Sequence, residues 1–277
     1  MHTSAIRVMA TGILLLSCFV LISCSGSSGP EPGTPAFYWA AAKDTFGTMD
    51  YVKTVEHLEK LTAGDNDYTA RARPWLLVMT SGMAHGYMDL AENFEAGARA
   101  NKSNPTDFRR HMNTYREQAD HLAVEFAEVF GKFQQGKDDP VPIAYAFPTG
   151  SAAPVMELTK AATGILLTPT EIDNGEKRAI ARGVLLQACV AAGAPDDVAK
   201  TENLLKAGTL QVARAAFVTA MAGTLFDESK LYGMRGLDNP ERVKVFCNRA
   251  LDALKTVPET KETKDLSTKI AKSLKTK

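Results

Sequence analysis

Residues 104–133, NPTDFRRHMNTYREQADHLAVEFAEVFGKF, form the longest regular pattern in the sequence. Apolar side chains recur there in steps of three and four, at Phe108, Met112, Tyr115, Ala119, Leu122, Phe126, Val129 and Phe133. This is the period of an α-helix with one apolar face, and Asn104 followed by Pro105 is typical of a helix start. Such a long apolar stripe has to be buried against other helices. The sequence therefore predicts a long helix inside a helical domain.

Four shorter helices are expected before this one. Thr34-Pro35 opens the first, with proline at the first helical position, and Asp50 can cap the second. The third is expected over 68–85 and the fourth over 87–100. Pro74 either kinks the third helix or marks its true start.

Residues 137–150, KDDPVPIAYAFPTG, form a proline-rich crossing that cannot be helical throughout. We expect this crossing either to separate two helical halves, 34–136 and 151–257, or to lie extended on the surface. Helices of the second half are expected over about 151–167, from a capping box at Thr168–Glu171 to Gly193, over 195–207, over 210–226 and after Asn239-Pro240. A lysine-rich helix at 258–277 closes the chain. Because no alternating strand pattern exceeds a few residues, the predicted fold class is all-α.

Residues 39–61 carry the pattern of a helical hairpin, with Gly47 for a tight turn, then Tyr51, the small Thr54 and Leu58. A similar pattern follows at Gly86-Tyr87, with Ala91 and Phe94, at about the spacing expected of a repeat. These segments resemble tetratricopeptide repeats. The resemblance implies helical hairpins stacked as a degenerate tetratricopeptide-like array, and the alternative is an irregular α-solenoid.

Residues 1–23 have the composition of an export signal. One charge, Arg7, precedes an apolar stretch that is shorter than the roughly 20 residues needed to span a bilayer. The stretch ends at Leu21-Ile22-Ser23-Cys24, which resembles the lipobox of bacterial lipoproteins. That resemblance implies cleavage before Cys24 and acylation of this residue, with residues 24–33, CSGSSGPEPG, as a flexible tether. The alternatives are a site at Cys18, which would leave a very hydrophobic N-terminus, or an ordinary secretory signal with an incidental cysteine.

Charge and cysteine content exclude some classes of function. Removing 23 of the 277 residues leaves 254, and takes away one of the 32 basic residues but none of the 32 acidic ones, so the mature chain has a net charge of −1. A neutral domain lacks the overall basic charge of a nucleic-acid-binding protein. Cys189 and Cys247 lie on apolar helical faces, where buried thiols are common. The sequence does not decide whether a disulfide joins them.

No pattern of catalytic or metal-binding residues is found. His111 and His121 lie ten residues apart on the long helix, about 15 Å along its axis, so they cannot bind one metal ion together. His57 and His85 have no second ligand at metal-binding spacing. Ser151 follows Thr149-Gly150 but lacks the second glycine of a nucleophile elbow. We therefore expect a protein that is not an enzyme and has no cofactor.

Aromatic side chains are the best candidates for a ligand or partner surface, since concave faces of helical repeats bind peptides and apolar molecules. Trp39, Trp75, Tyr87 and Tyr115 are the main candidates, and Phe37, Tyr38, Tyr145 and Phe147 could contribute. The expected function is that of an adaptor, anchored by its lipid to a membrane of the bacterial cell envelope and facing the periplasm, that binds another envelope protein. Ser25 after the lipidated cysteine favours the outer membrane.

A second function is suggested by a further resemblance. A lipobox followed by degenerate repeats and long helices is similar to the T-component lipoproteins of TRAP-type transporters. This resemblance implies a transporter-associated protein that binds an apolar small ligand.

Replacing Cys24 by Ser removes the thiol of the lipobox-like Leu21-Ile22-Ser23-Cys24. We expect the Cys24→Ser chain to appear as soluble or uncleaved protein, because acyl chains anchor through roughly 0.8 kcal/mol per buried methylene. Fractionation of cells and the electrophoretic mobility of the chain measure this. A variant that stays membrane-bound and normally processed would show that Cys24 is not the anchor.

Overall fold

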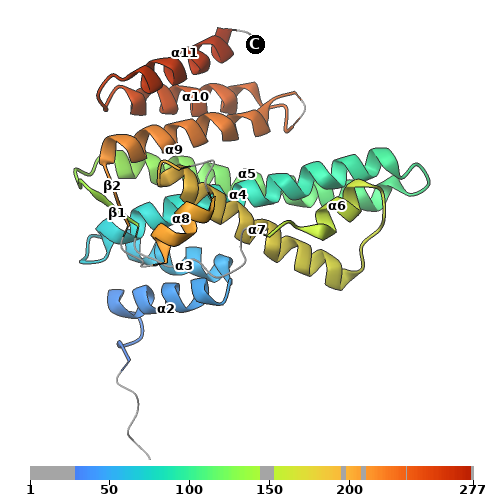
Figure 1. Cartoon of the computed structure of the whole chain (residues 1–277), viewed down its shortest axis with the longest axis horizontal. Coiled ribbons are helices and arrows are strands. Elements are labelled where there is room, and N and C mark those ends of the chain that lie inside the picture. Colours follow the sequence, from blue (N-terminus) through green and yellow to red (C-terminus); the bar gives the residue numbers. More distant parts are fainter. Residues whose placement is uncertain (1–28, 144–152, 195–197, 207–209, 235, 276–277) are drawn as a thin grey trace, which may run out of the picture.

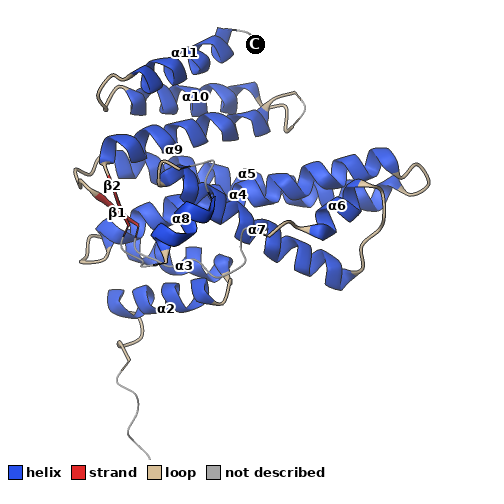
Figure 2. Ribbon diagram, in the orientation of Figure 1, coloured by secondary structure: helices blue, strands red, loops and turns tan. Residues whose placement is uncertain are grey.

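The computed structural model describes residues 29–143, 153–194, 198–206, 210–234 and 236–275. Its elements are shown in Figures 1 and 2. They are α2 (Pro35–Gly47), α3 (Tyr51–Thr62), α4 (Thr69–Ala100), α5 (Pro105–Gln134), β1 (Val141–Ile143), α6 (Met156–Ala162), α7 (Pro169–Ala191), α8 (Val198–Leu205), β2 (Leu210–Val212), α9 (Arg214–Glu228), the 3-10 helix η1 (Ser229–Tyr232), α10 (Pro240–Leu254) and α11 (Lys261–Lys275). The all-α fold class is confirmed. The predicted signal peptide, Cys24, residues 25–28, Tyr145 and Phe147 lie outside the described residues.

The predicted helix starts are confirmed where side chains bond the first turn. The Thr34 hydroxyl accepts from the Phe37 amide at 3.3 Å, and the Asp50 carboxylate accepts from the Lys53 amide at 3.3 Å. Thr168 and Glu171 form the full capping box at the start of α7. Each of these bonds joins residues three positions apart, which is why local sequence predicts them.

The long helix is confirmed as α5, and its stripe is buried. Phe108, Tyr115, Ala119, Leu122, Phe126, Val129 and Phe133 all lie in the core, and Met112 is partly buried against it. Helix α4 lies along α5, and the two form the long central hairpin of Figure 1. Helix α4 also contacts α3, α6, α7, α9 and β1. The buried side chains of both sequence halves thus form one core around α4.

The predicted break between two helices at Gly86-Tyr87 is wrong, because α4 continues through it from Thr69 to Ala100. Pro74 lies inside this helix, in its second turn, and is not the start of the helix. Gly86 has a different role from the turn that its sequence suggests. A Cβ atom at Gly86 would lie 2.8 Å from both the Ala179 carbonyl oxygen and the Ile180 Cα of α7.

Helices α4 and α7 therefore meet backbone to backbone at three glycines. A Cβ atom on Gly82 would lie 2.4 Å from the Val184 Cα, and one on Gly183 would lie 2.2 Å from the Gly82 carbonyl oxygen. Real side chains cannot approach this closely, so the crossing requires glycine on both helices. Small residues spaced four apart allow the same kind of close approach elsewhere. We call this contact of Gly82, Gly86 and Gly183 the glycine crossing.

Two short strands are present that the sequence did not predict. β1 pairs antiparallel with β2, with Val141 opposite Val212 and Ile143 opposite Leu210. Three residues are too few for an alternating pattern to be recognised, and Pro142 interrupts β1, which is tolerated because both strands are edges. The helix expected over 210–226 consequently begins later, at Arg214.

The structure shortens one predicted helix and answers the question of a disulfide. The helix expected over 151–167 is the shorter α6, Met156–Ala162, which ends just before Gly164 at a φ of 84°. The question of a disulfide is answered: Cys189 on α7 and Cys247 on α10 are both buried and are not joined to each other. Helices α10 and α11 lie at the opposite end of the molecule from α2 and α3 (Figure 1).

A methyl group added at the glycine crossing should destabilise the fold. For Gly183→Ala we expect a loss of at least about 1–3 kcal/mol in the free energy of unfolding, because the backbones would have to move apart. The matched control is Gly131→Ala on α5, where a Cβ atom would meet nothing within 4 Å. This control should gain about 0.4–1 kcal/mol by restricting the unfolded chain. Denaturant unfolding measures both, and a Gly183→Ala protein as stable as the control would contradict the crossing.

Candidate functional site

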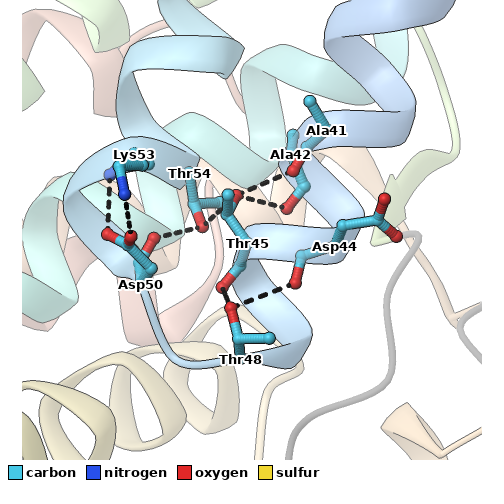
Figure 3. Close-up of polar contacts among 8 residues, drawn as sticks. All are labelled: Ala41, Ala42, Asp44, Thr45, Thr48, Asp50, Lys53 and Thr54. Atoms are coloured by element: carbon cyan, nitrogen blue, oxygen red, sulfur yellow. Dashed lines mark hydrogen bonds and ion pairs between the residues drawn. The ribbon is translucent and has the colours of Figure 1, made fainter.

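The turn between α2 and α3 is held by hydroxyl groups that bond across the hairpin. The Thr54 hydroxyl donates to the Asp50 carbonyl oxygen at 2.9 Å and lies 3.0 Å from the Thr45 hydroxyl (Figure 3). The Thr45 hydroxyl donates to the Ala41 carbonyl oxygen at 2.8 Å. Thr54 is fully buried, so a residue this small lets the two helices approach. The hairpin expected from residues 39–61 is present.

This turn presents two apolar side chains to solvent. Met49 has a φ of 60°, a left-handed conformation that is uncommon outside glycine and costs of the order of 1 kcal/mol. The Met49 amide donates to the Phe46 carbonyl oxygen at 3.0 Å, and the Asp50 amide donates to the Thr45 carbonyl oxygen at 2.9 Å. The Met49 side chain is 42% exposed and that of Val52 is 53% exposed. A strained, hydrogen-bonded turn thus holds apolar groups in water.

An open groove of about 690 Å³ lies beside these side chains. Residues 48–52 form one wall, residues of α7 between Asn174 and Ile180 form the other, and Tyr87 of α4 lines it between them. Tyr51, Tyr87 and Ile180 are buried, so the bottom of the groove is apolar. We call this site the turn groove.

A partly buried carboxylate faces the turn groove. The Tyr87 hydroxyl donates to Glu176 at 3.3 Å, and Tyr87 stacks on Tyr115 with 6.1 Å between ring centroids. Burial raises the pKa of Glu176, and hydrogen bonding from Tyr87 and Tyr115 offsets part of that effect. The Glu176 carboxylate can therefore accept further hydrogen bonds next to the apolar bottom of the turn groove.

Arg178 fixes the rim on the α7 side. Its guanidinium donates to both Glu157 oxygens, at 3.2 and 3.1 Å, and to the Pro154 carbonyl oxygen at 2.7 Å. These bonds bring the start of α6 against α7, with the exposed Met156 next to Glu157. The turn groove thus combines exposed apolar side chains with anchored charges of both signs.

The four main aromatic candidates fall into two places. The structure brings Tyr87 and Tyr115 together, and of the two Tyr87 lines the turn groove. Trp39 and Trp75 form a separate T-shaped pair with 5.3 Å between centroids, and Trp75 is 0% exposed. Sequence reasoning missed Met49, Val52 and Glu176. A methionine in the Gly47-Thr48-Met49-Asp50 turn was a usable signal, because turns seldom bury their side chains.

A second, larger groove of about 990 Å³ lies under α11. Its lining includes the apolar residues Leu186, Val190, Ala220 and Leu266, and charged residues of α11 such as Lys261 and Asp265. The Gln187 amide donates to the Thr224 hydroxyl at 2.7 Å beside it. This groove offers more apolar surface than the turn groove, with its charges confined largely to one helix.

Comparison with models of known protein families, with curated protein sequences and with solved structures gave no match for this chain. Among the described helices, none is both long and apolar enough to cross a membrane. Within the same part of the chain, no three His, Cys, Asp or Glu side chains lie close enough to hold a metal ion.

Replacing Glu176 by Gln tests the environment of this carboxylate. Because its pKa is raised in the folded chain, the stability that Glu176 contributes is present at low pH and is lost as the pH rises through the folded value. Glutamine cannot ionise but still accepts from Tyr87. Glu176→Gln should therefore lose less stability than the parent as the pH rises above the ordinary glutamate pKa of about 4.3. Denaturant unfolding across this range measures it.

The matched control for that experiment is Glu117→Gln, at an exposed glutamate on α5. Its pH profile should follow that of the parent. Parallel profiles for Glu176→Gln and the parent would mean that Glu176 is not desolvated in the folded chain.

Proposed function

We propose that this protein is a lipid-anchored protein of the bacterial cell envelope that binds a segment of a partner protein in the turn groove. The observation that carries this proposal is the pair Met49 and Val52, which a strained and hydrogen-bonded turn holds 42% and 53% exposed beside the groove. Exposed apolar side chains that lie together at the edge of a groove are a mark of an interaction site.

The chemistry of the turn groove favours a protein segment as its ligand. Methionine and aromatic residues are enriched at the centres of protein interfaces, with charged groups at the rim. Met49, Tyr51 and Tyr87 would form such a centre, and Lys177 and Arg178 such a rim.

The anchor in this proposal comes from the lipobox-like Leu21–Cys24. The tether would end at Gly33, directly before the Thr34 cap of α2, so it would lead straight into the folded domain. A lipid at Cys24 would hold the domain on a membrane and facing the periplasm, with Ser25 favouring the outer membrane. The partner would then be another envelope protein.

The proposal keeps only one unit of the tetratricopeptide-like arrangement. The α2–α3 hairpin supports one repeat-like unit, with Gly47, Tyr51, Thr54 and Leu58 at the expected places. The unbroken α4 leaves no second unit of that kind at Gly86. We propose one tetratricopeptide-like hairpin followed by irregular helical packing.

The groove under α11 supports a second candidate function, a transporter-associated protein that binds an apolar small ligand. Its volume of about 990 Å³ matches the upper range of small-molecule sites, and Leu186, Val190 and Leu266 offer apolar contacts. In that case the partner-binding role of the turn groove would be absent.

Site-specific photocrosslinking in cells tests the proposed function. A photoreactive residue at position 52 should give a discrete protein adduct, whereas the same residue at Val245 should not. Val245 is a matched control, because it is a valine on an exposed helix face, 46% exposed, on the distant α10. Met49→Asp should weaken the adduct-forming interaction at least about tenfold, which corresponds to 1.4 kcal/mol.

Three outcomes are informative. A partner adduct at position 52 that Met49→Asp abolishes supports the proposal. Equal adducts at positions 52 and 245 would mean unspecific proximity and would overturn it. The lack of any adduct at position 52 would favour the small-ligand function of the groove under α11.

A further inference from the structure

One charged side chain of the turn groove, Glu176, has no ion-pair partner. The other charged residues of the lining each form an ion pair within the chain: Asp50 with Lys53 at 2.8 Å, Lys177 with Asp173 at 3.6 Å and Arg178 with Glu157 at 3.1 Å. Glu176 forms no ion pair with any residue that the structure describes. These groups are four acids and three bases, so the groove has a net charge of −1, and the uncompensated charge is that of Glu176.

The hydrogen bonds that Glu176 accepts come from uncharged hydroxyl groups. The Tyr87 hydroxyl donates from 3.3 Å, which is longer than the usual distance of about 2.7–2.8 Å between two oxygen atoms. Tyr115 supplies a second hydroxyl contact. A carboxylate has about four lone-pair positions, so Glu176 can accept further donors. Burial raises the pKa of Glu176, because the charged form is disfavoured there, and a cation beside the carboxylate would offset that cost.

The surroundings of Glu176 fit a cation that is carried on a long apolar stem. Tyr51, Tyr87 and Ile180 are buried at the bottom of the turn groove, and Met49 and Val52 expose their side chains beside it. Lysine and arginine lay the methylene groups of their side chains along apolar surface and keep the charged head among polar groups. Such a stem would cover the apolar surface while its head reached the Glu176 carboxylate. A bare metal ion would leave the same surface in water.

We infer that the turn groove binds a segment in which a lysine or arginine lies between apolar residues, and that Glu176 pairs with this cation. The inference rests on the proposed function, because it names the chemistry of the partner segment. Hydrogen bonds between a cation and a carboxylate are roughly twice as strong as neutral ones. Opposite charges across an interface contribute more to the choice of partner than to affinity. Glu176 therefore selects among segments, and Met49 and Val52 supply apolar contact to all of them.

Selection of peptides on the full chain tests this preference. A library of random short peptides is selected against the parent chain, and those whose binding is weakened by Met49→Asp are assigned to the turn groove. Circular dichroism confirms that this variant is folded. The assigned peptides should be enriched in lysine or arginine with apolar neighbours. Glu176→Gln should weaken their binding at least about tenfold, because the peptide cation then lacks its counter-charge.

Two controls separate pairing at Glu176 from a general effect of charge. Glu117→Gln removes the same charge from an exposed position on α5 outside the groove lining, and it should leave the affinity unchanged. In the peptide, norleucine in place of lysine, or citrulline in place of arginine, removes the charge and keeps the stem. This exchange should weaken binding to the parent chain at least about tenfold but have little further effect on the Glu176→Gln chain, as expected of two directly interacting groups.

Failure of this inference can be distinguished from failure of the proposed function. If no selected peptide depends on Met49, the turn groove does not bind a protein segment, and both are wrong. If the peptides depend on Met49 but are not enriched in basic residues, or bind the Glu176→Gln chain as tightly as the parent, only the pairing with Glu176 is wrong. Equal weakening by Glu176→Gln and Glu117→Gln would also overturn the pairing, because overall charge would then be the cause.

Discussion

The contact between the α4 and α7 backbones at Gly82, Gly86 and Gly183 determines where most other elements can lie. Side chains of ordinary size would hold two helices 8–10 Å apart, but here a single added Cβ atom would lie 2.2 Å from a carbonyl oxygen. Because α4 also contacts α3 and α5, the glycine crossing joins α7 to the helices of the N-terminal half. One core therefore joins the two segments of the chain that the proline-rich residues 137–150 separate in sequence.

The turn groove is a consequence of this arrangement. Tyr87 follows Gly86 directly, and Ile180 lies where the Gly86 Cα meets α7, so the bottom of the groove adjoins the crossing. One turn earlier on α7, Glu176 reaches the Tyr87 hydroxyl. The α2–α3 turn forms the opposite wall through bonds of its own, between Thr45, Thr54 and Asp50. The groove thus lies between a locally determined hairpin and a helix placed by long-range packing.

This difference explains what the sequence could predict. Helix starts at Thr34, Asp50 and Thr168 depend on bonds within three residues, so local patterns were sufficient. The stripe of α5 was long enough to predict its burial. Gly86-Tyr87 looked like a repeat turn because the sequence does not show that α7 lies against this glycine. Glu176 and Tyr87 are 89 positions apart, so no local pattern could pair them. The strands β1 and β2 were too short to show an alternation.

The way the chain enters α2 also has a mechanical consequence. In a chain anchored at Cys24, any force between the membrane and a bound partner enters the domain at Pro35. Such a pull would peel α2 from its first turn onward, and it would meet the Tyr38 contact with Lys60 and the Trp39 contacts with Tyr68 and Trp75 before it reached Phe46. The hydrogen-bonded turn at Met49 follows the end of α2 and would feel the load last. The aromatic contacts at the start of α2 would therefore resist the pull first, and the turn groove would keep its shape until they broke.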